Sequence, residues 1–300
     1  MGHKGDWSRV TNQDSWDFNY SQINWGHMKT LVTGSEGVVA KELIPLLEGE
    51  LLLIDKKTGN NLNDESTWRK IVDFQPDIVY HLAASFERTK EDHRVAEKVY
   101  EDDIMATHNL LLNCMTDSVK TFVFPSSYLV YGKGTYQVSP RNMVGTAKWM
   151  NESELDAYKA TVNPKLAIIK ARIYRVYGKG SLDVISRWCK HKVNEIPVSI
   201  YNEENSFDYI HARDVAKGLK HAADSGFEGI FELGTGVSTK VKDVADMIGV
   251  EYDLMEPIED ELENTVCNHL AMQYLPEITV EEGIKEILAY EESRLNNVSR

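Results

Sequence analysis

Three small residues at regular spacing give the first indication of chemistry. Gly34, Gly37 and Ala40 follow the apolar run 29–33 at intervals of three residues and open an amphipathic stretch. In such a loop the first glycine allows a tight turn, and the second lets the backbone approach a pyrophosphate at a helix N-terminus. The small third residue lets the helix pack closely on the strand. The spacing therefore predicts a dinucleotide-binding loop.

An acidic residue at a suitable distance supports this prediction. Asp55 ends the next apolar run, 21 residues after Gly34. A carboxylate there can accept hydrogen bonds from the adenosine ribose hydroxyls and would repel a 2′-phosphate, which favours NAD over NADP. Lys56 and Lys57 follow directly and weaken this preference. Glu36 is an unfavourable neighbour for a pyrophosphate, so either its side chain points outward or it weakens binding.

The elements that position this loop alternate along the first half of the chain. Apolar runs rich in Val, Ile and Leu predict buried strands, and the amphipathic stretches between them predict helices. The strands are expected at 29–34, 50–55, 77–84, 120–127 and 165–174, and the helices at 37–47, 64–74, 96–115 and 145–161. This repetition implies right-handed crossovers and an α/β fold, namely a Rossmann-type doubly wound parallel sheet.

After about residue 175 the pattern loosens. Shorter strands are expected near 197–201, 208–211 and 229–233, and helices near 181–193, 213–224, 240–248 and 280–294. Thr279 and Glu282 have the spacing of a capping box at the start of the last helix. We expect residues 28–175 to form an NAD-binding domain. Residues 176–300 should form mainly a smaller C-terminal α/β substrate lobe, with returning segments that complete the sheet.

The first 27 residues differ from the rest of the chain. They contain three of the six tryptophans and many Asn, Gln, Ser and Asp residues, and Gly26 and His27 precede Met28 in the manner of a cloning scar. We interpret residues 1–27 as a leader or tag-like extension, with a native arm as the alternative.

The acidic composition of the chain argues against nucleic acid and anionic membranes as partners. The chain has 300 residues, a formal net charge of −14 and an isoelectric point near 5.1, so it should repel nucleic acid and anionic membranes. No apolar run approaches the ~20 residues that span a bilayer. Cys114, Cys189 and Cys267 form neither a disulfide framework nor a zinc motif. We therefore expect a cytoplasmic protein with buried thiols and no metal.

Several later segments resemble, in order, the motifs of one enzyme family. They are the HLAA segment 81–84, the SSxxVYG segment 126–132, the RxxxVYGxG segment 172–180, the DYIH segment 208–211 and the GTG segment 234–236. With the loop that begins at Gly34, they resemble the extended short-chain dehydrogenase/reductase family of NAD-dependent nucleotide-sugar epimerases and dehydratases. The resemblance runs from about residue 29 to about residue 290.

The resemblance implies a set of cofactor contacts and a subunit arrangement. Asn61 and Leu62 stand where the family touches the adenine, and the HLAA strand end lines the cofactor. The family often forms homodimers through two long helices, which here span about 96–115 and 145–161. The expected cofactor-binding residues are Gly34, Ser35, Glu36, Gly37, Val38, Asp55, Lys56, Asn61, Leu62, Leu82, Ala83, Ala84, Lys148 and Tyr174.

The catalytic positions of the family are only partly present. In the family a tyrosine phenolate removes a sugar hydroxyl proton while NAD takes the hydride, and a lysine four residues on lowers the tyrosine pKa. Ser127 and Lys148 occupy the Ser/Thr and lysine positions, but the tyrosine position is Val144, which cannot transfer a proton. Tyr128 is the candidate substitute. We expect Ser127, Tyr128 and Lys148 to be catalytic.

The substrate positions also depart from the family. Arg175 replaces an Asn that contacts the nucleotide sugar, and Phe207 replaces an Arg that clamps a phosphate. Tyr128 and Leu129 stand where dehydratases carry an acidic pair, which disfavours a 4,6-dehydratase. The expected substrate-binding residues are Ser85, Ser127, Arg175 and Phe207.

Other polar residues have simpler interpretations. His81 and His211 lie at strand ends, where a structural role is expected. The acidic cluster 101–103 stands near the start of a predicted helix, where negative charge favours the helix dipole.

Three functions remain open. Ser127 and Lys148 favour an NAD-dependent epimerase-like enzyme that acts on a UDP- or GDP-sugar by transient hydride transfer, with an altered catalytic base. The joint changes at Val144, Arg175 and Phe207 favour a pseudoenzyme that binds NAD or a sugar nucleotide. The third is an NAD(P)H-dependent carbonyl reductase with Tyr128 as proton donor.

Overall fold

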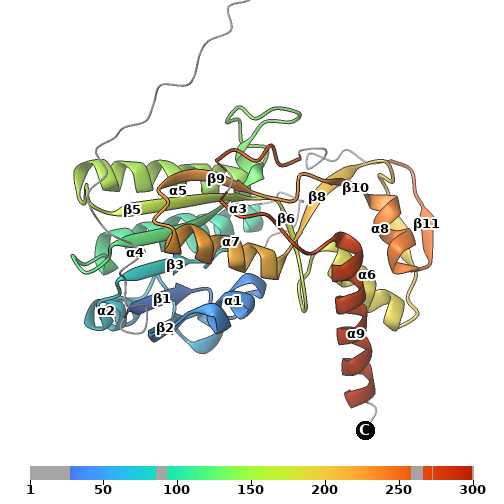
Figure 1. Ribbon diagram of the computed structural model, residues 1–300, viewed down its shortest axis with the longest axis horizontal. Helices are drawn as coiled ribbons and strands as arrows, with labels where there is room; N and C mark the ends of the chain where they lie inside the picture. Colours follow the sequence, from blue (N-terminus) through green and yellow to red (C-terminus); the bar gives the residue numbers. More distant parts are fainter. Residues whose placement is uncertain (1–27, 86–92, 258–265, 272, 299–300) are drawn as a thin grey trace, which may run out of the picture.

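A parallel sheet occupies the centre of the computed structural model, which describes residues 28–85, 93–257, 266–271 and 273–298 (Figure 1). Within these residues the sheet has six strands in the order β2-β1-β3-β4-β5-β9, and every neighbouring pair is parallel. The α/β class and the doubly wound parallel sheet are thus confirmed. The strands are β1 Lys29–Thr33, β2 Glu50–Ile54, β3 Ile78–His81, β4 Thr121–Ser127, β5 Ala167–Ile173 and β9 Gly229–Leu233.

Helices cover both faces of this sheet because successive strand residues point to opposite sides. In β1, Leu31 packs into the core beneath α2 Glu65–Phe74, α4 Ala106–Cys114 and α5 Met143–Thr161. The next residue, Val32, packs into the core shared with α1 Val38–Leu43 and α7 Ala212–Asp224. Buried strands of this kind read as continuous apolar runs, which is the pattern that the sequence carries.

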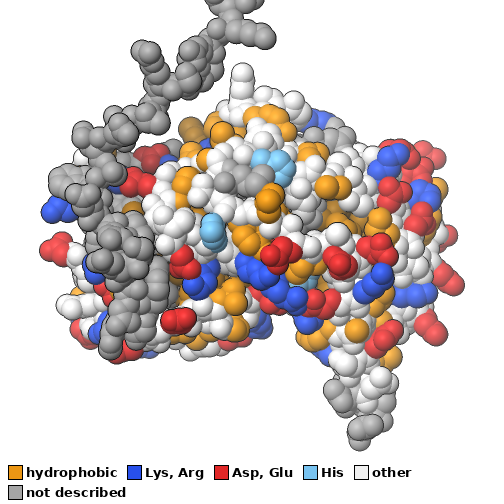
Figure 2. Space-filling model, in the orientation of Figure 1, with side chains coloured by type: hydrophobic (Ala, Val, Ile, Leu, Met, Phe, Trp, Pro, Cys, Tyr) orange, Lys and Arg blue, Asp and Glu red, His pale blue; other side chains and the backbone are white. Residues whose placement is uncertain are grey.

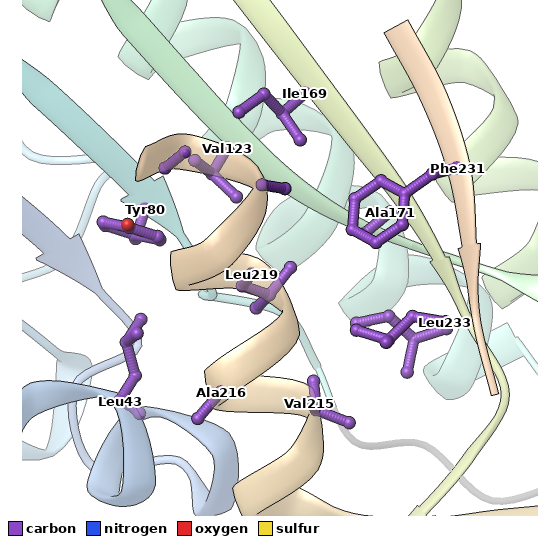
Figure 3. Close-up of a cluster of buried hydrophobic side chains, with 14 of the residues drawn as sticks. Leu43, Tyr80, Val123, Ile169, Ala171, Val215, Ala216, Leu219, Phe231 and Leu233 are labelled. Atoms are coloured by element: carbon purple, nitrogen blue, oxygen red, sulfur yellow. The ribbon is translucent and has the colours of Figure 1, made fainter. Parts of the chain in front are cut away.

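Much of the second core comes from the late part of the chain. Figure 3 shows Val215, Ala216 and Leu219 of α7 facing side chains of the sheet, among them Val123 of β4 and Phe231 of β9. Helix α7 and the edge strand β9 thus come after residues 174–211, which lie outside the central sheet. The central sheet is complete only when the chain has returned to it.

The segment predicted as one α-helix over 96–115 has a more complex structure. It consists of α3 His93–Val99, a π-helix Tyr100–Met105 and α4. The axis continues, but the wider turn shifts the direction in which the residues of the π-helix point. The prediction of a uniform α-helix was wrong at this point, because hydrophobic spacing does not record a single wide turn.

A smaller assembly of strands and helices follows β5. It contains the three-stranded sheet β10-β8-β6, the pair β11-β7 and three helices, with a separate core that includes Trp188, Tyr209, Val244 and Ile284. The three-residue strands β6, β10 and β11 were not predicted, since such short pieces carry no periodic signal. The bounds are β6 Arg175–Tyr177, α6 Val184–Val193, β7 Val198–Ile200, β8 Ser206–His211, β10 Ser238–Lys240, α8 Val241–Ile248, β11 Tyr252–Leu254 and α9 Val280–Val298.

The last helix begins with the capping box that the sequence predicts. The backbone N–H of Thr279 donates to the Glu282 carboxylate at 2.9 Å, and the N–H of Glu282 donates to Thr279 Oγ1 at 3.2 Å. Two backbone donors at the start of α9 are thereby satisfied.

The surface in view carries acidic and basic side chains side by side (Figure 2). None of the helices in the described ranges combines the length and apolar character needed to cross a membrane. Cys114, Cys189 and Cys267 are buried and form no disulfide, as expected. Residues 1–27 lie outside the described part.

Truncating the α7 contact should destabilise the protein strongly. Leu219 is fully buried against the sheet, so we expect Leu219→Ala to lower the free energy of unfolding by about 2–5 kcal/mol. Leu275→Ala is the matched control, because Leu275 is 68% exposed and its loss should cost about 0.5 kcal/mol or less. Urea unfolding of both variants measures the difference. Equal losses would contradict the assignment of α7 to the central core.

Candidate functional site

The loop between β1 and α1 has the backbone that its glycines predict. Gly34 has a φ of +68°, and an added Cβ would lie 2.6 Å from the backbone nitrogen of Ala83. Its N–H donates to the carbonyl of Ile54 at 2.7 Å. Gly34 thus lets the loop lie directly against the ends of β2 and β3, which other residue types would prevent.

The far end of this loop faces solvent with free donors. Gly37 is the N-cap of α1, so the N–H groups of Val38 and Val39 have no acceptor within the helix. Ser35 is buried, whereas Glu36 points toward Lys41, with 3.5 Å between carboxylate and ammonium. The acidic side chain is therefore directed along the helix, and the donors remain open to an anion.

Asp55 is fixed at the end of β2, beside the loop. One carboxylate oxygen accepts the N–H of Glu36 at 3.0 Å, and the other accepts the N–H of Lys57 at 2.8 Å. Lys56 points away from Asp55 and forms an ion pair with Asp102 of the π-helix. The carboxylate thus keeps a defined position at the carboxyl end of β2.

The predicted adenine contacts lie in the segment between β2 and α2, and the HLAA residues lie at the end of β3. Asn61 accepts the N–H of Asn63 through its side chain at 3.1 Å, while the Leu62 side chain is buried in the core under α2 and α4. Leu82 and Ala83 are half-buried and pack against the two cores, and Ala84 is exposed at the edge of the sheet.

A chain of buried hydrogen bonds runs beneath these strand ends. Thr33 Oγ1 bonds His81 Nδ1 at 2.7 Å, and His81 Nε2 bonds Thr107 Oγ1 at 2.9 Å. Asn151 donates to the same Thr107 oxygen at 3.0 Å. Burial lowers the pKa of His81 to about 3. The structural role expected for His81 is thus confirmed, because both ring nitrogens are bound inside the protein.

Asp103 is a site residue that the sequence interpretation missed. Instead of starting a helix, it lies within the π-helix, where it is buried and accepts the N–H of Ser85 at 2.5 Å. Its other carboxylate oxygen and the Ser85 hydroxyl have no hydrogen-bond partner among the described residues. Burial raises the pKa of Asp103, and the nearby Lys148 ammonium opposes this. Only the register of the π-helix, which has no sequence signal, brings Asp103 here.

Lys148 lies one turn into α5 and faces the same region. The side chain is buried with its ammonium over the Phe124 ring, 4.9 Å from the centroid, and it forms no hydrogen bond with any described residue. Burial lowers the pKa of Lys148, and the carboxylates of Asp103 and Glu152 oppose the shift. A buried ammonium without a hydrogen-bond acceptor is costly, and a ligand hydroxyl could supply one.

The start of α5 fixes the position of Val144 as well. Asn142 caps the helix by accepting the N–H of Gly145 at 2.8 Å, and an added Cβ on Gly145 would overlap the carbonyl oxygen of Leu129. Val144 and Lys148 are four residues apart and lie on the same helix face. The half-buried side chain of Val144 thus lies on the helix face that carries Lys148.

Two aromatic residues lie at the ends of β4 and β5. Tyr128 is buried and stacks on Tyr174, with 5.3 Å between ring centroids and 12° between the planes. The Arg141 guanidinium lies over the Tyr128 ring at 5.6 Å. The Tyr174 hydroxyl is buried without a hydrogen-bond partner in the described part of the chain, and burial raises its pKa. Ser127 accepts the N–H of Leu129 at 3.2 Å.

The two departures noted at substrate positions are neighbours in space. Arg175 on β6 and Phe207 on β8 lie on paired strands, and the guanidinium stands 4.2 Å from the Phe207 ring centroid. The guanidinium of Arg175 thus packs on the ring of Phe207. A planar guanidinium held in this way remains able to bind a phosphate.

A buried ion pair joins β5 to α5 below Lys148, and it was not predicted from the sequence. Arg172 on β5 binds both carboxylate oxygens of Glu152 on α5, at 3.0 and 2.6 Å, and Ser126 donates to the same carboxylate at 2.5 Å. These hydrogen bonds raise the pKa of Arg172 despite its burial. Glu152 lies one turn beyond Lys148, so the pair fixes the part of α5 that carries the lysine.

Asp208 and His211 hold the backbone around the site. Asp208 accepts N–H groups from Thr235, Gly236 and Cys267 at 2.8 to 3.0 Å. His211 caps α7 by accepting the N–H of Arg213 at 3.2 Å, which agrees with a structural role. Within the described residues no cluster of His, Cys, Asp and Glu could hold a metal ion.

The buried imidazole should make stability depend on pH. The pKa of His81 is about 3 in the folded chain against an ordinary value of 6.5. Between these values the unfolded chain binds a proton that the folded chain does not, so stability falls as the pH falls. The contribution lost between pH 7 and pH 5 is about 2 kcal/mol.

Urea unfolding of the protein and of His81→Gln at both pH values isolates this effect. The variant should be less stable at pH 7 but should lose about 2 kcal/mol less than the parent on acidification. Parallel losses in the two proteins would show that His81 is not held neutral.

The comparisons with known proteins agree with this geometry. Residues 30–234, more than half of the chain, match the model of the NAD dependent epimerase/dehydratase family. The UDP-glucose 4-epimerase of Rhizobium meliloti (strain 1021) is 26% identical over 204 residues, which are 58% of this chain and 61% of that protein. The UDP-glucose 4-epimerase of Caenorhabditis elegans is 29% identical over 209 residues, 57% of this chain and 59% of that protein.

These matches therefore span about three fifths of the length of the curated relatives. Among solved structures, the UDP-glucose 4-epimerase of Thermus thermophilus in complex with NAD superimposes with a TM-score of 0.78 at 24% identity. That comparison covers 88% of this chain and 99% of the other chain. At this identity it establishes a shared fold.

Proposed function

The chain belongs to the NAD-dependent epimerase/dehydratase family, and from this premise we propose that it is an epimerase-like enzyme acting on a UDP- or GDP-sugar. The observation that carries the proposal is Lys148, a buried ammonium without a hydrogen-bond partner in the described residues, at the carboxyl edge of the sheet. The relatives named UDP-glucose 4-epimerase support a nucleotide-activated sugar as substrate.

The residues present fit a nicotinamide dinucleotide. The open N–H groups that begin α1 suit the pyrophosphate, and the fixed carboxylate of Asp55 suits the adenosine ribose. Lys148 and the unpartnered hydroxyl of Tyr174 suit the nicotinamide ribose at the other end. The remaining cofactor contacts are assigned to Ser35, Glu36, the backbone of Lys56, Asn61, Leu62, Leu82, Ala83 and Ala84.

The chemistry divides between the cofactor and the side chains at the strand ends. NAD, when bound, supplies the acceptor for a hydride from the sugar carbon. Ser127 hydrogen-bonds the reacting oxygen of the sugar. The proton of this sugar hydroxyl passes to a protein side chain that acts as general base. With Val144 in the tyrosine position, we assign this role to Tyr128, which directly follows Ser127.

Substrate binding is assigned to the region between the two sheets. The Arg175 guanidinium, oriented by the Phe207 ring, suits one phosphate of a nucleotide diphosphate. Ser85, whose buried hydroxyl has no hydrogen-bond partner in the described part, suits a sugar hydroxyl. An acidic protein needs such a local cation to bind a polyanionic substrate.

Val144 favours a second candidate, a pseudoenzyme that binds NAD or a sugar nucleotide without turnover. The general base of the family is absent, and Tyr128 is buried between Tyr174 and Arg141. Binding without turnover requires only the loop, Asp55 and Lys148, all of which are present.

Turnover assays separate the two candidates. The purified protein, first analysed by mass spectrometry for released NAD or NADH, is given NAD and a panel of UDP- and GDP-sugars. We expect epimer formation, and we expect Lys148→Met to reduce it by about 100-fold or more while leaving the far-UV circular dichroism spectrum unchanged. Bound NAD without turnover across the panel would establish the pseudoenzyme instead.

Restoring the phenol tests the role of Val144 directly. Val144→Tyr should raise turnover by about 100-fold, because a positioned general base contributes roughly that much or more. Val144→Phe is the matched control, with the same ring and no hydroxyl. An equal gain in both variants would assign the effect to packing, and proton transfer from position 144 would be refuted.

We also propose that the protein is a homodimer that uses the π-helix, α4 and α5. Tyr100, Trp149 and Met150 are each more than 40% exposed. Tyr100 and Met150 line one groove, together with His108, Asn151 and Glu154. Exposed apolar side chains gathered at a groove are typical of an interface.

A charge placed in this groove should separate the subunits. Met150→Glu should raise the dimer dissociation constant by at least about tenfold, because it buries an unpaired carboxylate. Met247→Glu, on the exposed side of α8, is the control. Light scattering after size-exclusion chromatography gives the mass of each. An unchanged mass for Met150→Glu places the interface elsewhere.

A further inference from the structure

We propose that Asp102 sets the preference for NAD over NADP by holding the ammonium of Lys56 away from the adenosine ribose. The inference rests on the proposed binding of NAD. It assigns a specificity role to a residue of the π-helix, which lies 46 positions from Lys56 in the sequence.

The position of Lys56 makes it a candidate partner for a 2′-phosphate. It directly follows Asp55, whose carboxylate is fixed by the N–H groups of Glu36 and Lys57. A 2′-phosphate near Asp55 would meet like charge, and a cation beside it would offset the repulsion. Lys56 could supply that cation if its ammonium were free.

The structure gives this ammonium another partner. Lys56 Nζ forms an ion pair with the Asp102 carboxylate, and the two side chains are 50% and 15% exposed. The carboxylate is thus mostly shielded from water and salt, which strengthens its hold on the ammonium relative to an open surface pair. While Lys56 is paired with Asp102, its ammonium does not offset the repulsion between Asp55 and a 2′-phosphate.

A second contact keeps the same two segments together. Asn63 donates through its side-chain nitrogen to the carbonyl oxygen of Glu101 at 3.1 Å, and its side-chain oxygen accepts from Asn109 at 2.9 Å. The backbone of the π-helix is therefore tied to the segment after β2 independently of the ion pair. Asp102 is held in register with Lys56.

The two neighbouring carboxylates of the π-helix contact different segments of the chain. Asp102 pairs with Lys56, whereas Asp103 accepts the N–H of Ser85. Consecutive helix residues point in different directions, so only Asp102 is placed to hold the Lys56 ammonium. Two carboxylates, Asp55 and Asp102, then act together against NADP, the first by repulsion and the second by occupying the cation.

Equilibrium binding of both cofactors tests the proposal without any assay of turnover. Dissociation constants for NAD and NADP are measured by isothermal titration calorimetry on the whole chain and on Asp102→Asn. We expect the ratio of NADP to NAD affinity to rise about tenfold in the variant, because a released ammonium gains a charge-assisted contact with the 2′-phosphate. NAD affinity should change little.

Further variants separate this effect from loss of the fold. Lys56→Gln added to Asp102→Asn should abolish the gain, whereas Lys57→Gln added to it should leave the gain in place. Glu101→Gln is the matched control, because the contact of Glu101 with Asn63 uses its backbone carbonyl; its ratio should equal that of the parent. Thermal unfolding of each variant verifies that it is folded.

The outcomes are distinguishable from failure of the proposed function. A parent protein that binds neither cofactor overturns the proposed NAD site and this inference with it. A parent that binds NAD, with a folded Asp102→Asn variant whose ratio stays within twofold, overturns only the role of Asp102. A gain that survives Lys56→Gln refutes Lys56 as the responsible cation.

Discussion

The arrangement of this site depends on one uncharged chain of hydrogen bonds. Thr33, His81, Thr107 and Asn151 come from β1, β3, α4 and α5, and their contacts join the four elements beneath the strand ends. Each polar group in the chain depends on its neighbour, because water does not reach it. Burial lowers the pKa of His81 to about 3, so the imidazole in this chain is neutral. The elements that carry the glycine loop, the HLAA end, Asp103 and Lys148 are thereby held in one geometry.

Charge is arranged around this neutral chain in a consistent way. Lys148 lies between the carboxylates of Asp103 and Glu152, and Arg172 neutralises Glu152 through two hydrogen bonds. The result leaves Lys148 and Asp103 as the charged groups with unused hydrogen-bonding capacity. Such groups are costly in a closed core and useful at a binding site.

The sequence allowed the fold to be predicted in outline because buried parallel strands are continuous apolar runs. The glycine loop and Asp55 were identifiable for a similar reason, since their function requires fixed residue types at fixed distances. The roles of Asp103 and of Arg172 with Glu152 were not predictable. The position of Asp103 depends on a π turn, and the pairing of Arg172 with Glu152 depends on the packing of elements that are distant in the sequence. Neither feature produces a periodic pattern of hydrophobic residues. Arg172 within the apolar run 165–174 was the single available signal.

The same limits apply to the substrate side. Arg175 and Phe207 were recognised as departures, but only the pairing of β6 with β8 shows that the guanidinium rests on the ring. Tyr128 was identified by its position next to Ser127, whereas its stacking on Tyr174 follows from packing alone.

The return of the chain to its first sheet has a consequence for synthesis. When Ile173 has been made, β5 has no neighbour on its outer side and one face of the sheet lacks α7. Sixty further residues, 174–233, must be added before β9 is complete. At about 5–20 residues per second, a ribosome needs roughly 3 to 12 seconds to supply them. During that interval the nascent chain presents an unpaired edge and an apolar face to the cell, so the need for a chaperone should be greatest between the synthesis of β5 and that of β9.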